Sequence, residues 1–160
     1  MLSVQFLCVG KMKEKFYIEG AAEYAKRLSG YCKLTVTELA EERLPDNPSR
    51  AQIDAALEKE AAAILSKLPK GGKVVALCVE GKPMSSEKLA ETMDGWTVGG
   101  ASQLTFLIGG SYGMHESVKA RADLRLSMSP MTFPHHLARV MVLEQIYRAF
   151  KINEGSSYHK

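Results

Sequence analysis

The chain has 160 residues, of which 46% are hydrophobic and 24% charged, and its formal net charge is +3 at pH 7. This length fits one domain with a substantial core, so we expect residues 1–160 to form a single domain. No apolar run approaches the ~20 residues of a membrane-spanning helix, which excludes an integral membrane protein of that kind. Three cysteines without a CxxC pair predict buried free thiols, and therefore a cytoplasmic protein.

The positive charge is concentrated in the last third of the chain. Residues 1–100 carry fourteen Lys/Arg and fourteen Asp/Glu, whereas residues 101–160 carry seven and four, so the whole excess of three lies there. All four histidines, at positions 115, 135, 136 and 159, lie there too. A basic third fits an anionic partner such as RNA, although an excess of three charges is equally consistent with chance.

Hydrophobic periodicity predicts strands that alternate with helices. Strands are expected at 4–10, 33–39, 74–80, 103–110 and 124–129, and helices at 13–28, 49–68, 85–93, 111–122 and 134–150. Serines at the start of two of these helices, near Ser49 and Ser85, suit N-caps. The alternation is typical of an α/β fold in which a mainly parallel sheet is flanked by helices.

Three loops are candidates to form a single ligand site, because ligands of parallel sheets bind at the carboxyl ends of the strands. The loops read VEGKPMS, IGGSYGM and MSPMTFPH. Gly109, Gly110 and Gly113 in the second loop let backbone N–H groups approach a ligand closely. The pattern is neither that of dinucleotide-binding proteins nor the Walker motif, and a turn without a ligand fits it equally well.

The third loop leads into the last predicted helix. Pro130 and Pro134 restrict its backbone, and Thr132 is placed to cap the helix. His135 should project from the helix N-terminus, where the dipole disfavours an imidazolium, so we predict a neutral side chain that accepts a proton. The adjacent His136 points elsewhere on a helix, so we expect no metal site.

The last predicted helix is apolar around a wide arc. Its large apolar residues are Leu137, Val140, Met141, Leu143, Ile146, Tyr147 and Phe150. Burial over so wide an arc indicates contact with more than the sheet, which predicts a subunit interface. Glu144 and Arg148 are four residues apart and are placed to pair.

The chain ends in the polar segment INEGSSYHK. A flexible tail is the simplest interpretation of this composition. Tyr158, His159 and Lys160 nevertheless combine an aromatic ring with two groups that can carry positive charge, and such a set can stack on and clamp a nucleotide.

Several of these segments carry a resemblance to a known family. FLIGGSYGM, LSMSPMTFPHHLARVMVLEQIYRAFKI and SSYHK resemble segments of the SPOUT-class methyltransferases. They are most similar to the small bacterial RlmH type (formerly YbeA), which methylates N3 of a pseudouridine in 23S rRNA. The similarity runs from the initial MLSVQFLCVGK to the last residue.

The resemblance implies a SPOUT α/β fold with a C-terminal trefoil knot, a feature that general fold rules disfavour. It implies S-adenosylmethionine bound in the knot by the three loops. Carried over position by position, the cofactor-binding residues are Leu77, Gly109, Met128, Ser129, Pro130, Met131, Thr132 and Phe133. It also implies a homodimer in which one subunit's tail completes the other's site, and an rRNA substrate presented by the ribosome, with assembled 70S particles favoured.

The implied reaction is in-line transfer of a methyl group from a sulfonium to N3 of the pseudouridine. Because the sulfonium is already a good electrophile, the protein mainly positions the reactants and helps to remove the N3 proton. His135 suits proton removal, and Arg139 and Arg148 are candidates to hold a phosphate or charge that develops on the ring carbonyls. Tyr158 and His159 complete the predicted catalytic set.

Two other classes of function stay open. A ribosome-binding assembly factor would keep the knotted fold without catalysis, and the intact IGGSYGM loop and YHK tail argue against it. A hydrolase that uses the histidine pair lacks an obvious nucleophile with an oriented base.

Overall fold

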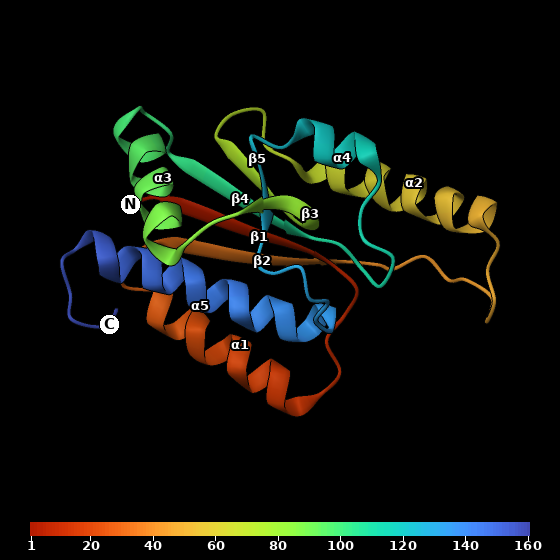
Figure 1. Cartoon of the computed structure of the whole chain (residues 1–160), viewed down its shortest axis with the longest axis horizontal. Coiled ribbons are helices and arrows are strands. Elements are labelled where there is room, and N and C mark those ends of the chain that lie inside the picture. The colour runs from red at the N-terminus through yellow and green to blue at the C-terminus, as the bar shows by residue number, and fades with distance from the viewer.

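A computed structural model describes all 160 residues and contains one five-stranded sheet (Figure 1). Its strands are β1 (Ser3–Val9), β2 (Lys33–Leu39), β3 (Lys73–Pro83), β4 (Gln103–Ile108) and β5 (Leu124–Ser127). The helices are α1 (Lys15–Leu28), α2 (Arg50–Lys67), α3 (Ser86–Val98), α4 (Glu116–Arg121) and α5 (His135–Asn153). The strand order is β2-β1-β4-β3-β5 and every pair is parallel. The predicted α/β fold is confirmed.

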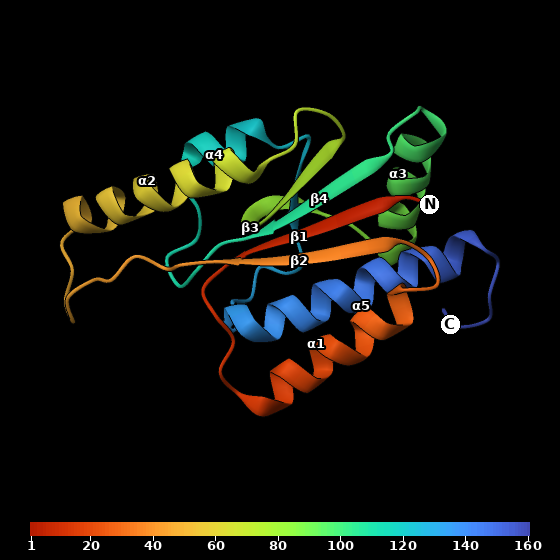
Figure 2. The ribbon, with the colours of Figure 1, turned by 180° about the vertical axis from the view of Figure 1, so that it is seen from behind.

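Helices cover both faces of the sheet. Phe6 and Phe106 face α1, α3 and α5, whereas the next residue on each strand, Leu7 or Leu107, faces α2 and α4. Figures 1 and 2 show α1 and α5 side by side on one face and α2 with α4 on the other. Because successive side chains of a strand alternate between two buried faces, the central strands have nearly continuous apolar sequences.

Side chains fix several helix starts. Ser49 and Gln52 form a complete capping box at α2, and the Ser85 side chain accepts a hydrogen bond from the Lys88 N–H, as predicted. The predicted cap at Thr132 is wrong: α5 begins at His135, and Pro134 occupies the N-cap position, where proline has no hydroxyl or carboxylate to accept a hydrogen bond. None of these helices is both long enough and apolar enough to cross a membrane.

The apolar arc of α5 is largely used within the chain. Leu143 and Ile146 are buried on the sheet, and α1 and α3 pack along the two sides of the helix. Gly20 of α1 lies so close to α5 that an added Cβ would stand 3.3 Å from Val140. The width of the arc therefore does not by itself require a second subunit.

The strand β3 arches over β5 near its end. Leu126 of β5 is opposite Leu77 in one part of the ladder and opposite Lys82 in the next, with four residues between them bulging away. At Gly81 an added Cβ would lie 2.8 Å from the backbone of Arg125 and of Leu126. The two backbones therefore cross in direct contact, an arrangement consistent with the knot that the family resemblance implies.

This crossing predicts that Gly81→Ala destabilises the fold, because the new methyl group meets backbone that cannot rotate away. We expect a loss of roughly 1–3 kcal/mol, the usual effect of overpacking. Gly95→Ala is the matched control, since a Cβ at this helical position meets nothing within 4 Å. It should stabilise the protein by roughly 0.5–1 kcal/mol through helix propensity. Urea unfolding measures both changes, and equal stabilities would contradict the crossing.

Candidate active site

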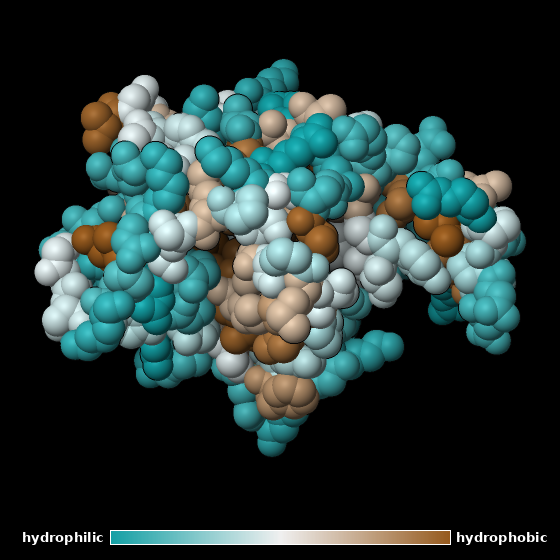
Figure 3. Space-filling model, in the orientation of Figure 1, coloured by the Kyte–Doolittle hydropathy of each residue, from teal (hydrophilic) through white to brown (hydrophobic).

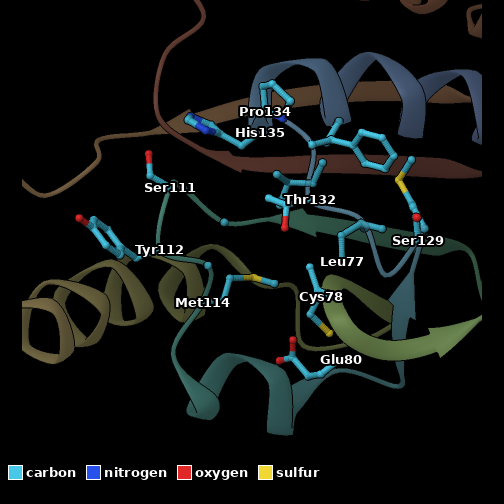
Figure 4. A pocket seen from close by; sticks show the side chains of 18 of the residues that line it. Leu77, Cys78, Glu80, Ser111, Tyr112, Met114, Ser129, Thr132, Pro134 and His135 are labelled. Atoms are coloured by element: carbon cyan, nitrogen blue, oxygen red, sulfur yellow. The ribbon is translucent and has the colours of Figure 1, made fainter. Parts of the chain in front are cut away.

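A cavity of about 800 Å³ lies at the carboxyl ends of β3, β4 and β5 (Figure 4). Its volume is within the range of small-molecule sites. The three predicted loops form its walls. Of the eight residues predicted to bind the cofactor, seven line this cavity and Pro130 does not: the seven are Leu77, Gly109, Met128, Ser129, Met131, Thr132 and Phe133.

Other lining residues were not among those predicted to bind the cofactor. Cys78 and Glu80 follow Leu77 along β3, and Tyr112 lies in the glycine-rich loop, so their membership of the same loops was the available signal. Lys119 of α4 also lines the cavity and pairs with Glu80. Ala138 enters from α5, one turn after His135, and only the docking of that helix reveals it.

The glycine-rich loop folds back on itself. Gly110 and Gly113 form an isolated antiparallel bridge, and Gly113 has a φ of +83°. A Cβ added at Gly109 would lie 2.6 Å from the Gly113 carbonyl carbon and 2.7 Å from Met114 Cγ. Glycine at 109 is thus required by the loop itself. A larger residue there would distort the loop as well as obstruct a ligand.

His135 lines the cavity at the start of α5 and is half-buried. Burial lowers its pKa below the usual 6.5, and the nearby His136 and Arg139 lower it further, while Glu41 and Glu14 oppose the shift. The direction agrees with the neutral imidazole predicted from the sequence. The main cause is desolvation by burial, whereas the sequence argument relied on the helix dipole.

Arg139 is not a free cation at the cavity. Its side chain is buried, and its guanidinium donates to the carbonyls of Val9 (3.0 Å) and Gly10 (2.5 Å) and to Glu38 Oε2 (2.6 Å). Burial of Glu38 raises its pKa, but hydrogen bonds from the Met12 N–H and from Arg139 outweigh this and hold the pKa below its usual value. The geometry gives Arg139 a positioning role: it fixes the β1–α1 loop beneath His135.

The other predicted catalytic residues gather at the far end of α5. Arg148 pairs with Glu144 (2.8 Å), as predicted, and also contacts His159 Nδ1 (3.0 Å). Tyr158 donates from its hydroxyl to Glu144 (3.0 Å), and its ring lies 4.8 Å from the Arg148 guanidinium. The tail therefore packs on its own chain instead of extending into solvent.

The predicted catalytic set thus falls into two groups within one chain. Arg148 is thirteen positions after His135 on α5, and a rise of 1.5 Å per residue places them roughly 20 Å apart. No group of three His, Cys, Asp or Glu side chains is placed to hold a metal ion in either group or elsewhere.

Comparison with known proteins identifies the family. The family model described as "Predicted SPOUT methyltransferase" matches residues 2–159. The chain belongs to the SPOUT methyltransferases. A relative from Clostridioides difficile, named ribosomal RNA large subunit methyltransferase H, is 48% identical over 99% of this chain and 100% of its own. A relative of the same name from Streptococcus uberis is 45% identical with the same coverage.

Solved structures support the fold of this SPOUT methyltransferase. A probable methyltransferase from Bordetella pertussis has a TM-score of 0.58 and 16% identity, covering 93% of this chain and 95% of that one. A tRNA (m1G37) methyltransferase from Aquifex aeolicus has a TM-score of 0.54 and 13% identity, covering 91% and 69%. A putative methyltransferase from Legionella pneumophila, solved with bound SAM, has a TM-score of 0.51 and 11% identity, covering 92% and 66%.

The environment of His135 predicts a measurable titration. Its imidazole should titrate below pH 6.5, and Glu41→Gln should lower the pKa further, because the Glu41 carboxylate favours the charged ring. Glutamine keeps an oxygen to accept the Ser111 N–H that Glu41 now accepts. NMR titration of the imidazole signals measures both values, with Glu91→Gln on the exposed face of α3 as the control. An unchanged midpoint in Glu41→Gln would contradict this description of the site.

Proposed function

We propose that this SPOUT methyltransferase transfers a methyl group from S-adenosylmethionine to N3 of a pseudouridine in 23S rRNA. The observation that carries the proposal is full-length identity of 48% with a protein named ribosomal RNA large subunit methyltransferase H. The sequence motifs of the RlmH type support the same substrate. We further propose that the substrate is the assembled ribosome, that the enzyme acts in the cytoplasm as a homodimer, and that its backbone forms a trefoil knot.

The cavity fits the proposed methyl donor. Its apolar lining from Leu77, Ile108 and Phe133 suits an adenine ring, and Gly109, Gly110 and Gly113 of the glycine-rich loop line the same space. A fold relative with bound SAM supports this choice. When bound, the donor supplies a methyl group on a positively charged sulfur. Leu77, Gly109 and the residues 128–133 are the groups that we propose hold it, with Pro130 acting on the loop's shape rather than on the ligand.

His135 is the residue that we propose accepts the N3 proton. Its lowered pKa keeps it neutral at pH 7, and it stands at the rim of the cavity. Arg139 supports this role indirectly by holding the loop under the ring. Nearby Glu41 would stabilise the imidazolium that forms.

A second subunit would reunite the two groups of predicted catalytic residues. Arg148, Tyr158 and His159 lie about 20 Å from His135 along the helix of one chain. A partner chain running antiparallel would bring its own tail to the cavity. We therefore propose that Arg148, Tyr158 and His159 act in the site of the other subunit, where they hold the target base and its phosphate.

The decisive experiment is transfer of tritiated methyl groups from labelled S-adenosylmethionine to intact ribosomes and to isolated subunits that lack the modification. Label at N3 of a 23S pseudouridine is the expected result. Stable binding to ribosomes without any transfer would instead support an assembly factor and overturn the proposal. Transfer to isolated subunits at an equal rate would remove the preference for assembled 70S particles.

Filling the cavity should abolish donor binding. Thr132 is exposed and its side chain points into the cavity, so Thr132→Trp places a large ring there without disturbing the core (Figure 4). We expect affinity for S-adenosylmethionine to fall at least tenfold, about 1.4 kcal/mol, by isothermal titration. Thr35→Trp, on the exposed edge strand β2, is the control. Unchanged affinity in a folded Thr132→Trp would show that the donor binds elsewhere.

Replacing Tyr158 of the C-terminal tail with alanine should slow methyl transfer. Loss of a stacking ring worth roughly 1–3 kcal/mol should reduce turnover on ribosomes by about 5- to 150-fold and leave donor binding intact. Tyr158→Phe is the control, because it keeps the ring and loses only the hydrogen bond to Glu144. Mixed dimers of Tyr158→Ala and Thr132→Trp should recover part of the activity, since each contains one intact composite site. Absence of recovery would place the tail's action within its own chain.

A further inference from the structure

A lysine-rich segment lies beside the cavity and has no role in the reaction described above. Residues 11–15, KMKEK, connect β1 to α1, and we call them the lysine segment. The segment follows the carboxyl end of β1, so it lies on the same edge of the sheet as the cavity. A Cβ added at Gly10, immediately before it, would stand 3.7 Å from His135 Nε2.

The lysine segment is held firmly although most of it has no regular secondary structure. The Gly10 N–H donates to the Leu39 carbonyl (2.7 Å), and the Gly10 carbonyl accepts from the buried Arg139. The Met12 N–H donates to Glu38 (3.0 Å), and Glu14 contacts His136 Nδ1 (3.2 Å). Both ends of the segment are thus tied to the element that carries His135. A surface ordered in advance loses less entropy when it binds a partner.

The acidic and basic side chains around this segment behave differently. The carboxylates of Glu14, Glu38 and Glu41 accept hydrogen bonds within the chain, from His136 Nδ1, the Met12 N–H and the Ser111 N–H respectively. Lys11 and Lys13 are exposed, and neither side chain forms an ion pair or hydrogen bond. The third lysine of the segment is 3.8 Å from Glu19 in an exposed pair, which contributes little. The segment therefore presents its positive charges to the outside.

Most basic side chains of residues 101–160 are neutralised by ion pairs, unlike Lys11 and Lys13. Five of the seven basic residues in this range form ion pairs: Lys119, Arg125, Arg139, Arg148 and Lys151. Lys11 and Lys13 therefore supply unpaired positive charge beside the cavity from the part of the chain where the sequence count is balanced.

We propose that the lysine segment binds the sugar–phosphate backbone of the RNA strand next to the target nucleoside. The inference rests on the proposed function, because it takes the cavity to be where that nucleoside reacts. Lysines act as mobile point charges that attract phosphates without reading bases. Their contacts would position the strand, while the cavity and His135 act on the single base that enters.

The test compares two triple variants that remove the same charge. Lys11→Gln, Lys13→Gln and Lys15→Gln together neutralise the segment. Lys33→Gln, Lys67→Gln and Lys70→Gln together neutralise three exposed lysines near the amino-terminal ends of β2 and β3, at the opposite edge of the sheet. Binding to ribosomes and to a fluorescent single-stranded RNA of the target sequence is measured over a range of salt concentrations, together with KM and kcat for methyl transfer.

Loss of the lysine segment should weaken binding to both ligands roughly tenfold and raise KM for ribosomes. The slope of log affinity against log salt should become shallower by roughly 2, since three phosphate contacts to a single strand contribute about 0.7 each. The control triple should bind as the unaltered protein does. Affinity and salt slope equal in the two triple variants would overturn the proposal.

Two further outcomes distinguish RNA binding by the lysine segment from a contact with a ribosomal protein and from failure of the proposed function. Weaker binding to ribosomes with unchanged binding to the RNA would mean that the segment contacts a ribosomal protein, which would also overturn the assignment to RNA. If the unaltered protein binds RNA through these lysines but transfers no methyl group, the proposed function fails and the docking surface stands.

Discussion

The buried guanidinium of Arg139 is the interaction on which the site depends. It joins α5 to the end of β1 through the carbonyls of Val9 and Gly10 and to β2 through Glu38. A buried guanidinium needs partners for its charge, and Arg139 finds them for Nη1 and Nη2 while its Nε has none, so these contacts determine how α5 docks on the sheet. The docking in turn places His135 at the cavity, one helical turn earlier. The same contacts hold the loop that leads to α1, so one side chain organises both the reactive histidine and the surface beside it.

Close backbone approach is the second constraint on the site. Gly81 allows β3 to cross β5 in direct contact, and Gly109 allows the glycine-rich loop to fold against Gly113. These two positions bring loops from β3, β4 and β5 around one cavity. Their glycines act through the shape of the chain, which explains why the loop sequence matches no standard phosphate-binding pattern while still forming a ligand-sized space.

The basic residues of this protein indicate an anion-binding surface only when their ion-pair partners are known. Most basic residues of the last third are paired, whereas Lys11 and Lys13 are free beside the site. Ion pairing removes a charge from the field that an approaching polyanion meets. The anionic partner suggested by the sequence is therefore retained, but the surface proposed for it is at the other end of the chain.

The sequence by itself determined the order of strands and helices and the mainly parallel sheet, because these depend on periodicity, which is a local property. The loops that follow the strands indicated the edge of the sheet where a ligand would bind, and the resemblance to the SPOUT class supplied eight residues there, seven of which line the cavity. The tertiary structure decided which arginine of α5 is buried in the core and which lies beside the C-terminal tail. Arg139 is separated from Glu38 by 101 positions, and Arg148 lies with the tail far from His135. Residue spacing along a helix gives the side on which a side chain lies, but only the packing of distant segments determines whether it is buried and paired or free to meet a ligand.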